Sequence, residues 1–214
     1  MNMHTDLKRH DLLIDGKRLP PGTGEYSVDI DPATEQTIAL VAQGSAADVD
    51  TAVRAARAAL KVWNGMRAAE RGRILHRLAD LMRTHQDELA ELESRDAGKP
   101  IAAVLRQDLP AAIDTLTYYA GWCDKITGQV VPVRPDALTY TVREPVGVVA
   151  AIVPWNFPLM IGMWKIAPAL ACGCTLIVKP AEITPLTALR VGELALEAGV
   201  PPNVGTSCSN GRIC

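Results

Sequence analysis

The sequence lacks the features that mark membrane-spanning and nucleic-acid-binding proteins. Its longest apolar stretch, residues 146–171, is interrupted by prolines and by Lys165, which a helix inside a bilayer would tolerate poorly. The 22 Lys and Arg residues are balanced by 24 Asp and Glu residues, for a formal net charge of -2, whereas binding to a phosphate backbone requires a basic face. We therefore expect no membrane and no nucleic acid among the partners of this protein.

Signs of secretion and of cysteine-based cross-links are also missing. The five cysteines are an odd number and form no CxxC pair, so we expect reduced thiols rather than a disulfide framework or a zinc site. Residues 1–10 are polar, and no apolar segment of the kind found in secretory signals follows them. The cytoplasm is the location that these absences favour.

The composition that remains is that of an ordinary globular protein. Hydrophobic residues make up 48% and charged residues 21% of the 214 positions, enough for one large domain or two small ones. Near the start, Asp15-Gly16 predicts a tight hairpin over residues 12–19, because these residue types tolerate positive φ angles. We expect a short strand over residues 26–30.

The next hundred residues have the apolar spacing of helices. One helix is predicted to begin after Ser45, with Asp48 in its first turn as the partner of the cap. A second is predicted over residues 68–97, ended by Gly98. A third is predicted from residue 101 to about residue 121, with a kink at Pro110, which lacks an amide hydrogen.

The pattern changes to strands after residue 127. Valine-rich segments on either side of a Pro135-Asp136 turn predict a β-hairpin over residues 127–143. Residues 146–153 form a continuous apolar run, typical of a strand buried on both faces of a parallel sheet. A helix over residues 158–171 and a strand over residues 174–178 should follow.

A last helix is predicted between its cap Thr184, with Pro185 at the first helical position, and Gly199 past its end. This strand–helix–strand–helix order predicts an α/β fold with a doubly wound parallel sheet, in which ligands bind at the carboxyl ends of the strands. The loops at residues 154–157 and 179–183 lie at those ends. From residue 203 onward we expect no regular structure.

Several motifs occur here in a fixed order and together resemble the aldehyde dehydrogenase superfamily. The motifs are Asp31-Pro32-Ala33-Thr34, Asp96-Ala97-Gly98-Lys99-Pro100, Tyr118-Tyr119-Ala120-Gly121-Trp122, Glu144-Pro145-Val146-Gly147-Val148, Pro154-Trp155-Asn156-Phe157-Pro158 and Lys179-Pro180-Ala181-Glu182. The resemblance covers roughly residues 12–202 and implies an N-terminal portion of such an enzyme, similar to general and betaine-aldehyde dehydrogenases. Any one tetrapeptide alone would be weak evidence, whereas the ordered set is specific.

The resemblance implies a role for each strand-end loop. Asn156 would donate its side-chain amide to the aldehyde oxygen as part of an oxyanion hole; without the flanking motif it would be an ordinary turn or cap residue before Pro158. Lys179 and Glu182 would bind the ribose hydroxyls of NAD, with NADP less favoured because a carboxylate repels a 2'-phosphate. The alternative is a solvated ion pair. The residues expected to line the cofactor pocket are Ile152, Val153, Pro154 and Trp155.

Further family features would map onto other parts of the chain. A structural K+ or Na+ would be held by Ile30, Asp96 and Ile183, although Asp96 could equally be a plain helix-end residue. The hairpin matches the family's oligomerisation arm, which implies a homo-oligomer, either a dimer or a tetramer. The implied division is a helical part of the cofactor-binding domain (1–123), the oligomerisation hairpin (124–145), a Rossmann-like NAD-binding βαβα segment (146–202) and a divergent tail (203–214).

The family's chemistry, oxidation of an aldehyde to a carboxylic acid with NAD(P)+ through a thiohemiacetal and a thioester, needs a nucleophilic cysteine and a general base. The segments that carry these groups in the family do not occur in this sequence, so we expect a fragment that is inactive by itself. Cys208 lies in a polar tail with no evident base to activate it, and an ordinary exposed thiol is expected there.

Two alternatives remain open from the sequence. The chain could be a non-catalytic oligomer partner or a dinucleotide-binding module, or the fold could serve related thiol chemistry on acyl phosphates or acyl-coenzyme A. The substrate would be a small aldehyde, and the segment 118–122 together with Met163 and Trp164 suggests aliphatic, aromatic or amino aldehydes such as betaine aldehyde. Half of a doubly wound sheet would leave apolar faces uncovered, so we also expect marginal folding of the isolated chain.

Overall fold

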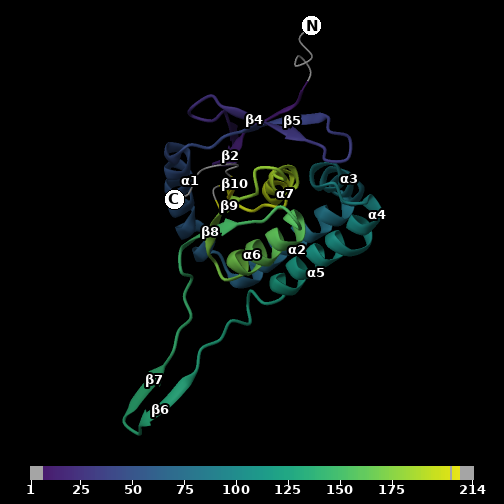
Figure 1. Ribbon diagram of the computed structural model, residues 1–214. Helices are drawn as coiled ribbons and strands as arrows, with labels where there is room; N and C mark the ends of the chain where they lie inside the picture. The colour runs from purple at the N-terminus through teal and green to yellow at the C-terminus, as the bar shows by residue number, and fades with distance from the viewer. Residues whose placement is uncertain (1–6, 203, 208–214) are drawn as a thin grey trace.

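A five-stranded sheet lies at the centre of the body of the molecule (Figure 1). The structure, a computed structural model, describes residues 7–202 and 204–207. The strand order is β3-β2-β10-β9-β8, with bounds β2 Leu12–Ile14, β3 Lys17–Leu19, β8 Val148–Ile152, β9 Thr175–Lys179 and β10 Gly205–Ser207. Strands β8, β9 and β10 are parallel. The sheet is therefore mixed rather than wholly parallel, because the antiparallel β2–β3 hairpin adds to β10 at one end.

Local turn chemistry explains the hairpin. Asp15 and Gly16 both have positive φ angles, of 55° and 66°, as a tight two-residue turn between twisted strands requires.

A small second sheet has the strand order β1-β5-β4. Strand β4 (Tyr26–Ile30) confirms the expected strand, whereas β1 (Arg9–His10) and β5 (Thr37–Ala42) were not predicted.

The first helix confirms its predicted start. Helix α1 (Ala46–Gly65) is capped by Ser45, whose hydroxyl oxygen accepts from the amide of Asp48 at 3.3 Å, while the Asp48 carboxylate accepts from the amide of Ser45 at 2.8 Å. This reciprocal pair satisfies amides that the helix itself leaves unpaired.

The second predicted helix is wrong in one respect, because it is two helices. Helix α2 (Ala68–Thr84) ends at His85, where the chain bends, and α3 (Gln86–Ala97) follows. Gly98 ends α3 in the left-handed conformation, as expected. Helix α4 (Ile101–Ala103), a π-helical turn (Val104–Asp108) and α5 (Leu109–Ala120) follow, and this irregularity lies immediately before Pro110.

Helices cover both faces of the sheet. Helix α6 (Pro158–Ala171) confirms its prediction. Helix α7 (Leu186–Glu197) begins later than predicted, because Thr184 does not cap it. The buried hydroxyl of Thr184 has no hydrogen-bond partner. On β9, Leu176 and Val178 pack into the core formed with α2, α5, α6 and α7, whereas Ile177 packs against α1. This alternation is what a strand between two helical layers requires.

Two expectations about strand environment are corrected. Strand β8 is not buried on both faces: it is the edge strand, and Ile152 is 57% exposed. Residues 205–207 are not irregular, because they form β10 beside β9, while residues 208–214, including Cys208, lie outside the described residues. Sequence periodicity cannot detect a three-residue strand whose neighbours are supplied by distant segments.

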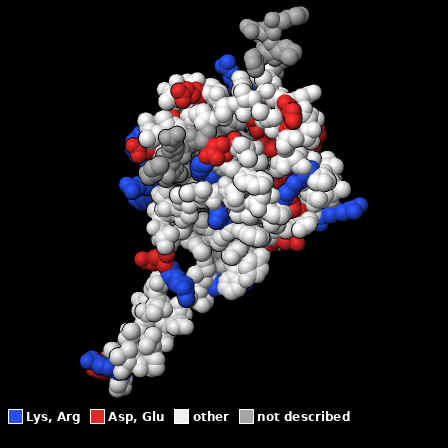
Figure 2. Space-filling model, in the orientation of Figure 1, with Lys and Arg blue, Asp and Glu red and all other residues white. Residues whose placement is uncertain are grey.

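The hairpin over residues 127–143 is confirmed and projects away from the body (Figure 1). Strands β6 (Val130–Arg134) and β7 (Ala137–Tyr140) pair antiparallel, and every residue of both is exposed. On the face seen in Figure 2, acidic and basic side chains are interspersed over the body, and most of the arm carries neither. No helix among the described residues has the length and apolarity needed to cross a membrane.

Candidate active site

The structure brings the two strand-end loops together. Ile152 and Lys179 are register partners at the carboxyl ends of β8 and β9. Just beyond them, the amide of Val153 donates to the carbonyl oxygen of Lys179 at 3.0 Å. The segment 154–157 and the segment 179–183 therefore leave neighbouring strands at the same edge of the sheet, which is the expected place for a ligand in this class of fold.

Asn156 lies in the first loop with its side chain free for a ligand. The residue is exposed, and among the described residues none hydrogen-bonds to its amide. Helix α6 starts two residues later, with Phe157 as its cap residue and no side-chain cap. Asn156 is thus not the helix cap, and it lies in the bend that precedes Pro158.

Lys179 and Glu182 are in direct contact in the second loop. Their side chains form an ion pair with relative exposures of 14% and 46%. The hydrogen bond from Lys179 lowers the pKa of the Glu182 carboxyl, so Glu182 is ionised at neutral pH. One donor group and one acceptor group therefore stand side by side at the end of β9.

The four expected pocket residues differ in exposure. Val153 is 3% exposed and belongs to the main core, so its backbone rather than its side chain is accessible at the strand end. Ile152 and Trp155 are 57% and 59% exposed, and Pro154 is also exposed. These three present apolar surface beside Asn156.

A pair of buried carboxylates lies where β4 meets the end of α3. Asp29 and Asp96 are each 2% exposed, and no Lys or Arg pairs with either among the described residues. Burial raises the pKa of Asp29 from 3.8 to about 6, and burial with the neighbouring Asp29 carboxylate raises that of Asp96. Oδ2 of Asp96 accepts from the amide of Leu186 at 2.9 Å, whereas Oδ1 has no partner.

The chain segments next to Asp29 and Asp96 contain the other two residues expected to hold a cation, Ile30 and Ile183. Ile30 follows Asp29 on β4, and Ile183 precedes the start of α7, whose Leu186 amide contacts Asp96. Sequence reasoning missed Asp29. The available signal was an acidic residue inside the predicted strand over residues 26–30.

A depression of about 450 Å³ lies between α5 and α6 and is lined by aromatic residues and one carboxylate. Its lining consists of Asp114, Thr115, Tyr118, Tyr119 and Trp164. The Tyr118 and Tyr119 rings meet edge to face at 5.1 Å. Tyr118 and Trp164 are more than half exposed, so their ring faces are available to a ligand.

The described cysteines are free thiols without activation. Cys123 and Cys174 are buried and Cys172 is exposed. Burial raises the pKa of the Cys123 and Cys172 thiols, which keeps both protonated at neutral pH. Neither of these two thiols therefore has the electrostatic surroundings of a catalytic nucleophile, and Cys174 is buried.

Comparison with known proteins places these features in one family. The aldehyde dehydrogenase family pattern matches residues 21–212, which extends beyond Pro202, where we expected the resemblance to end. Aldehyde dehydrogenase 1A1 of Mesocricetus auratus is 50% identical over 194 residues, covering 89% of this chain and 37% of that protein. The mitochondrial aldehyde dehydrogenase family 2 member B4 of Arabidopsis thaliana is 45% identical over 206 residues, covering 95% and 38%.

A solved structure is similar over the same span. The NAD+ complex of an aldehyde dehydrogenase from Bacillus cereus matches with a TM-score of 0.93 and 43% identity, covering 95% of this chain and 42% of that chain. The chain therefore spans about two fifths of the length of these relatives.

Proposed function

This chain belongs to the aldehyde dehydrogenase family, and we propose that it contributes a dinucleotide site and an oxyanion donor to the oxidation of an aldehyde to a carboxylic acid. The observation that carries this proposal is the placement of the Asn156 loop beside the Lys179–Glu182 loop, joined by the backbone bond between Val153 and Lys179. The sequence contains neither the family's nucleophilic cysteine segment nor its glutamate segment. The 214 residues alone therefore do not turn over aldehyde in this proposal.

Asn156 is the donor to the aldehyde oxygen. When a thiolate attacks an aldehyde, negative charge develops on that oxygen, and a preorganised donor stabilises it by about 3 kcal/mol. The exposed Asn156 amide, which no described residue engages, is free to donate at the strand end. Ile152 and Trp155, which are both exposed, offer apolar surface beside it for a ligand to cover.

Lys179 and Glu182 hold the adenosine ribose of NAD. The ammonium of Lys179 donates to a ribose hydroxyl and the carboxylate of Glu182 accepts from one, a donor and acceptor set that fits a diol. Because the Glu182 carboxyl is ionised, it disfavours a 2'-phosphate and therefore NADP. Bound NAD supplies the hydride acceptor. The Bacillus cereus relative, whose structure is an NAD+ complex, supports this choice of cofactor.

Calorimetric titration of the chain with NAD and NADP tests this assignment. We expect NAD to bind more tightly than NADP, Lys179→Ala to weaken both, and Glu182→Gln to reduce the preference for NAD. Lys125→Ala, which removes a lysine from an exposed ion pair at the base of the arm, is the matched control. Wild-type chain that binds NADP as tightly as NAD would contradict the role of Glu182, and failure to bind either would contradict the site.

A monovalent cation, Na+ or K+, fits the buried carboxylates. The carboxyl groups of Asp29 and Asp96 are buried against each other, and neither pairs with a basic side chain among the described residues; oxygen-rich sites of this kind suit hard cations. In the proposed site, Asp96 provides a carboxylate oxygen, and Ile30 and Ile183 provide backbone oxygens. The cation neutralises charge that the described residues leave uncompensated.

The exposed arm serves assembly in this proposal. Val130 and Val133 are 69% and 63% exposed on a two-stranded ribbon, and such ribbons are rarely stable without a partner strand. We assign residues 124–145 to pairing with another subunit in a dimer or tetramer. Residues 7–123 and 146–202 share one core and form the cofactor-binding part, to which Val204 and strand β10 also belong. Among the described residues, Cys123, Cys172 and Cys174 form no disulfide, which is consistent with a cytoplasmic protein.

The same arm favours a second candidate function, a non-catalytic partner in an oligomer with a full-length family member.

The aromatic depression bears on the substrate of the assembled enzyme. Tyr118, Trp164 and Asp114 offer ring faces and a carboxylate, which together attract a quaternary ammonium group such as that of betaine aldehyde. Quenching of tryptophan fluorescence by betaine aldehyde, reduced by Asp114→Asn, would support this substrate class, and equal quenching by propanal would count against it.

A further inference from the structure

Glu93 is a fully buried carboxylate that contacts two helices at once. It lies on α3 with 0% exposure. Its Oε1 accepts from the amide of Leu159 in the first turn of α6 at 3.2 Å, and its Oε2 accepts from the Thr187 hydroxyl in the first turn of α7 at 2.7 Å. Both oxygens are thereby used, and one side chain joins the beginnings of α6 and α7.

Helices α6 and α7 depend on α3 because neither has a side-chain cap of its own. The first amides of a helix have no partner within it, and its N-terminus carries partial positive charge. Glu93 satisfies one such amide on α6, and Asp96, one turn further along α3, satisfies the amide of Leu186 on α7 at 2.9 Å. Two carboxylates of α3 therefore replace the missing caps.

The same end of α3 also reaches the first strand-end loop. Lys99, just beyond the helix, places its ammonium 3.5 Å from the centroid of the Phe157 ring and pairs with Asp108. Phe157 follows Asn156 directly. The loop that carries Asn156 is thus held on one side by Lys99 and on the other by the Glu93 contact with Leu159.

These contacts fix the two site loops relative to each other. Asn156 precedes the first residue of α6 by two positions, and the Lys179–Glu182 loop leads into α7. We infer that Glu93 is a positioning residue of the proposed site: by binding the first turns of α6 and α7 together, it sets the placement of Asn156 relative to the Lys179–Glu182 pair. The inference rests on the proposed function for the roles of those three residues.

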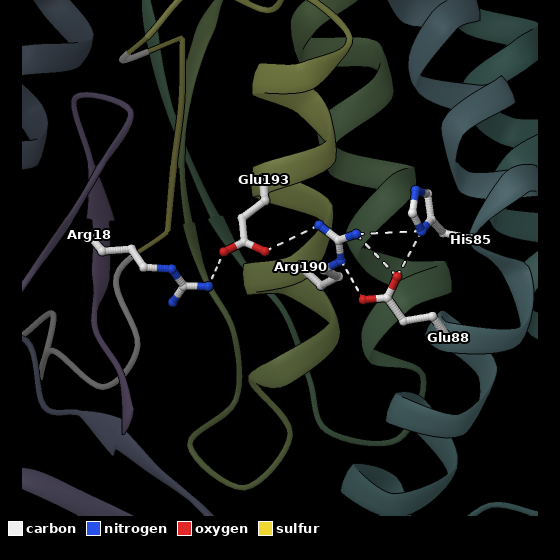
Figure 3. A network of polar contacts seen from close by, with 5 residues as sticks. All are labelled: Arg18, His85, Glu88, Arg190 and Glu193. Atoms are coloured by element: carbon white, nitrogen blue, oxygen red, sulfur yellow. Dashed lines mark hydrogen bonds and ion pairs between the residues drawn. The ribbon is translucent and has the colours of Figure 1, made fainter. Parts of the chain in front are cut away.

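The exposed end of α3 provides a comparison within the same pair of helices. There, Glu88 accepts from Arg190 of α7 at 2.6 Å and contacts His85, while Arg190 and Arg18 both contact Glu193 (Figure 3). This network also links α3 to α7, but its side chains are 22–47% exposed, unlike the buried Glu93, and it includes no residue of α6. Exposed ion pairs contribute little to stability, so Glu88→Ala is a matched control.

Hydrogen–deuterium exchange of the 214-residue chain tests the mechanical part of the inference without any ligand. In Glu93→Ala we expect amides in residues 154–162 and in residues 183–190 to exchange about tenfold faster, because a buried donor left unpaired weakens the local structure. Residues 74–82 of α2 should not change. Glu93→Gln should restore protection in both segments, since its amide group can accept from Leu159 and donate to Thr187.

Two outcomes would overturn the inference. One is faster exchange in only one of the two segments, and the other is uniform acceleration that includes α2. If Glu93→Ala does not fold, Thr187→Val provides the milder test: it should accelerate exchange in residues 183–190 and, through the loosened carboxylate, in residues 154–162. Unchanged exchange at residues 154–162 in a folded Thr187→Val chain would then refute the coupling.

Dinucleotide affinity tests the functional part and separates it from the proposed function. We expect Glu93→Ala to weaken NAD binding about tenfold, because only the fraction of molecules with aligned loops binds. Glu93→Gln and Glu88→Ala should bind as the wild type does. Wild-type chain that does not bind NAD would contradict the proposed function, while the exchange result would still decide whether Glu93 couples the loops. Wild-type affinity in Glu93→Ala would refute the positioning role.

Discussion

His10 should make the protein less stable in mild acid. It lies on β1 with 8% exposure, and its Nδ1 has no hydrogen-bond partner. A cavity of about 360 Å³ adjoins it, between the small sheet and the helices α3 and α7. Burial, followed by the positive charges of Lys8 and Arg18, lowers the pKa of His10 from 6.5 to about 4, and the opposing influence of Glu193 and Asp11 is smaller.

The sign of the effect follows from proton linkage. Above pH 6.5, His10 is neutral in both the folded and the unfolded chain and the pH has no effect through this residue. As the pH falls below 6.5, the unfolded chain gains a proton that the folded chain does not gain until about pH 4. The free energy of unfolding should therefore decrease by about 2 kcal/mol between pH 7.5 and 5, and by about 3 kcal/mol in total.

Urea unfolding followed by tryptophan fluorescence at pH 7.5 and pH 5 measures this loss. The pKa values of Glu93, Asp29 and Asp96 are raised by burial, so these groups act in the opposite direction, and only the difference between wild type and His10→Gln isolates His10. That difference should change by about 2 kcal/mol between the two pH values. His76→Gln, an exposed histidine on α2, controls for the loss of an imidazole. Identical pH dependence in wild type and His10→Gln would refute the reasoning.

Three further predictions concern the core, the cation and the arm. Trp63 is fully buried and its indole nitrogen donates to the carbonyl oxygen of Leu170 at 3.0 Å, so Trp63→Phe should lower the unfolding free energy by roughly 1–3 kcal/mol in urea titrations; no change in midpoint would contradict that packing. Potassium chloride should raise the melting temperature of wild type above that in N-methylglucamine chloride, and Asp96→Asn should abolish the difference; a cation effect that survives the substitution would exclude Asp96 as a ligand. Replacing residues 129–141 by a short glycine linker should reduce the assembled mass measured by light scattering, and an unchanged mass would remove the arm from the interface.

The features predicted correctly from the sequence are those decided by neighbours along the chain. The Asp15-Gly16 turn, the Ser45 cap with Asp48, and the Gly98 helix end each depend on residues within a few positions of one another, and local backbone preference dictates them. The ordered motifs around Asn156 and Lys179 gave the family for a related reason, since an ordered set of short motifs is specific.

The expectations that failed depended on contacts between distant segments. The bend at His85 interrupts a continuous helical pattern, β10 forms only because β9 and β2 lie on either side of it, and β8 is an edge strand although its sequence resembles that of a central one. Apolar periodicity reports that a face is buried and does not report which segment covers it. The two errors about β8 and β10 could not be avoided without knowing the pairing order of the strands.

The sequence by itself determined where most of the helical segments lie, the local turns, the family and the identity of the residues at the strand ends. Only the tertiary structure decided how these residues are held. Asp29 meets Asp96 across 67 positions, and Glu93 meets Leu159 and Thr187 across 66 and 94 positions. Acidic residues on a helix normally face water, and nothing in their local sequence distinguishes those that instead cap another helix. Which acidic residues cap another helix depends on how α3, α6 and α7 pack. An unpaired amide or carboxylate is costly once it is buried, so the packing favours hydrogen bonds between the buried carboxylates of α3 and the first amides of α6 and α7.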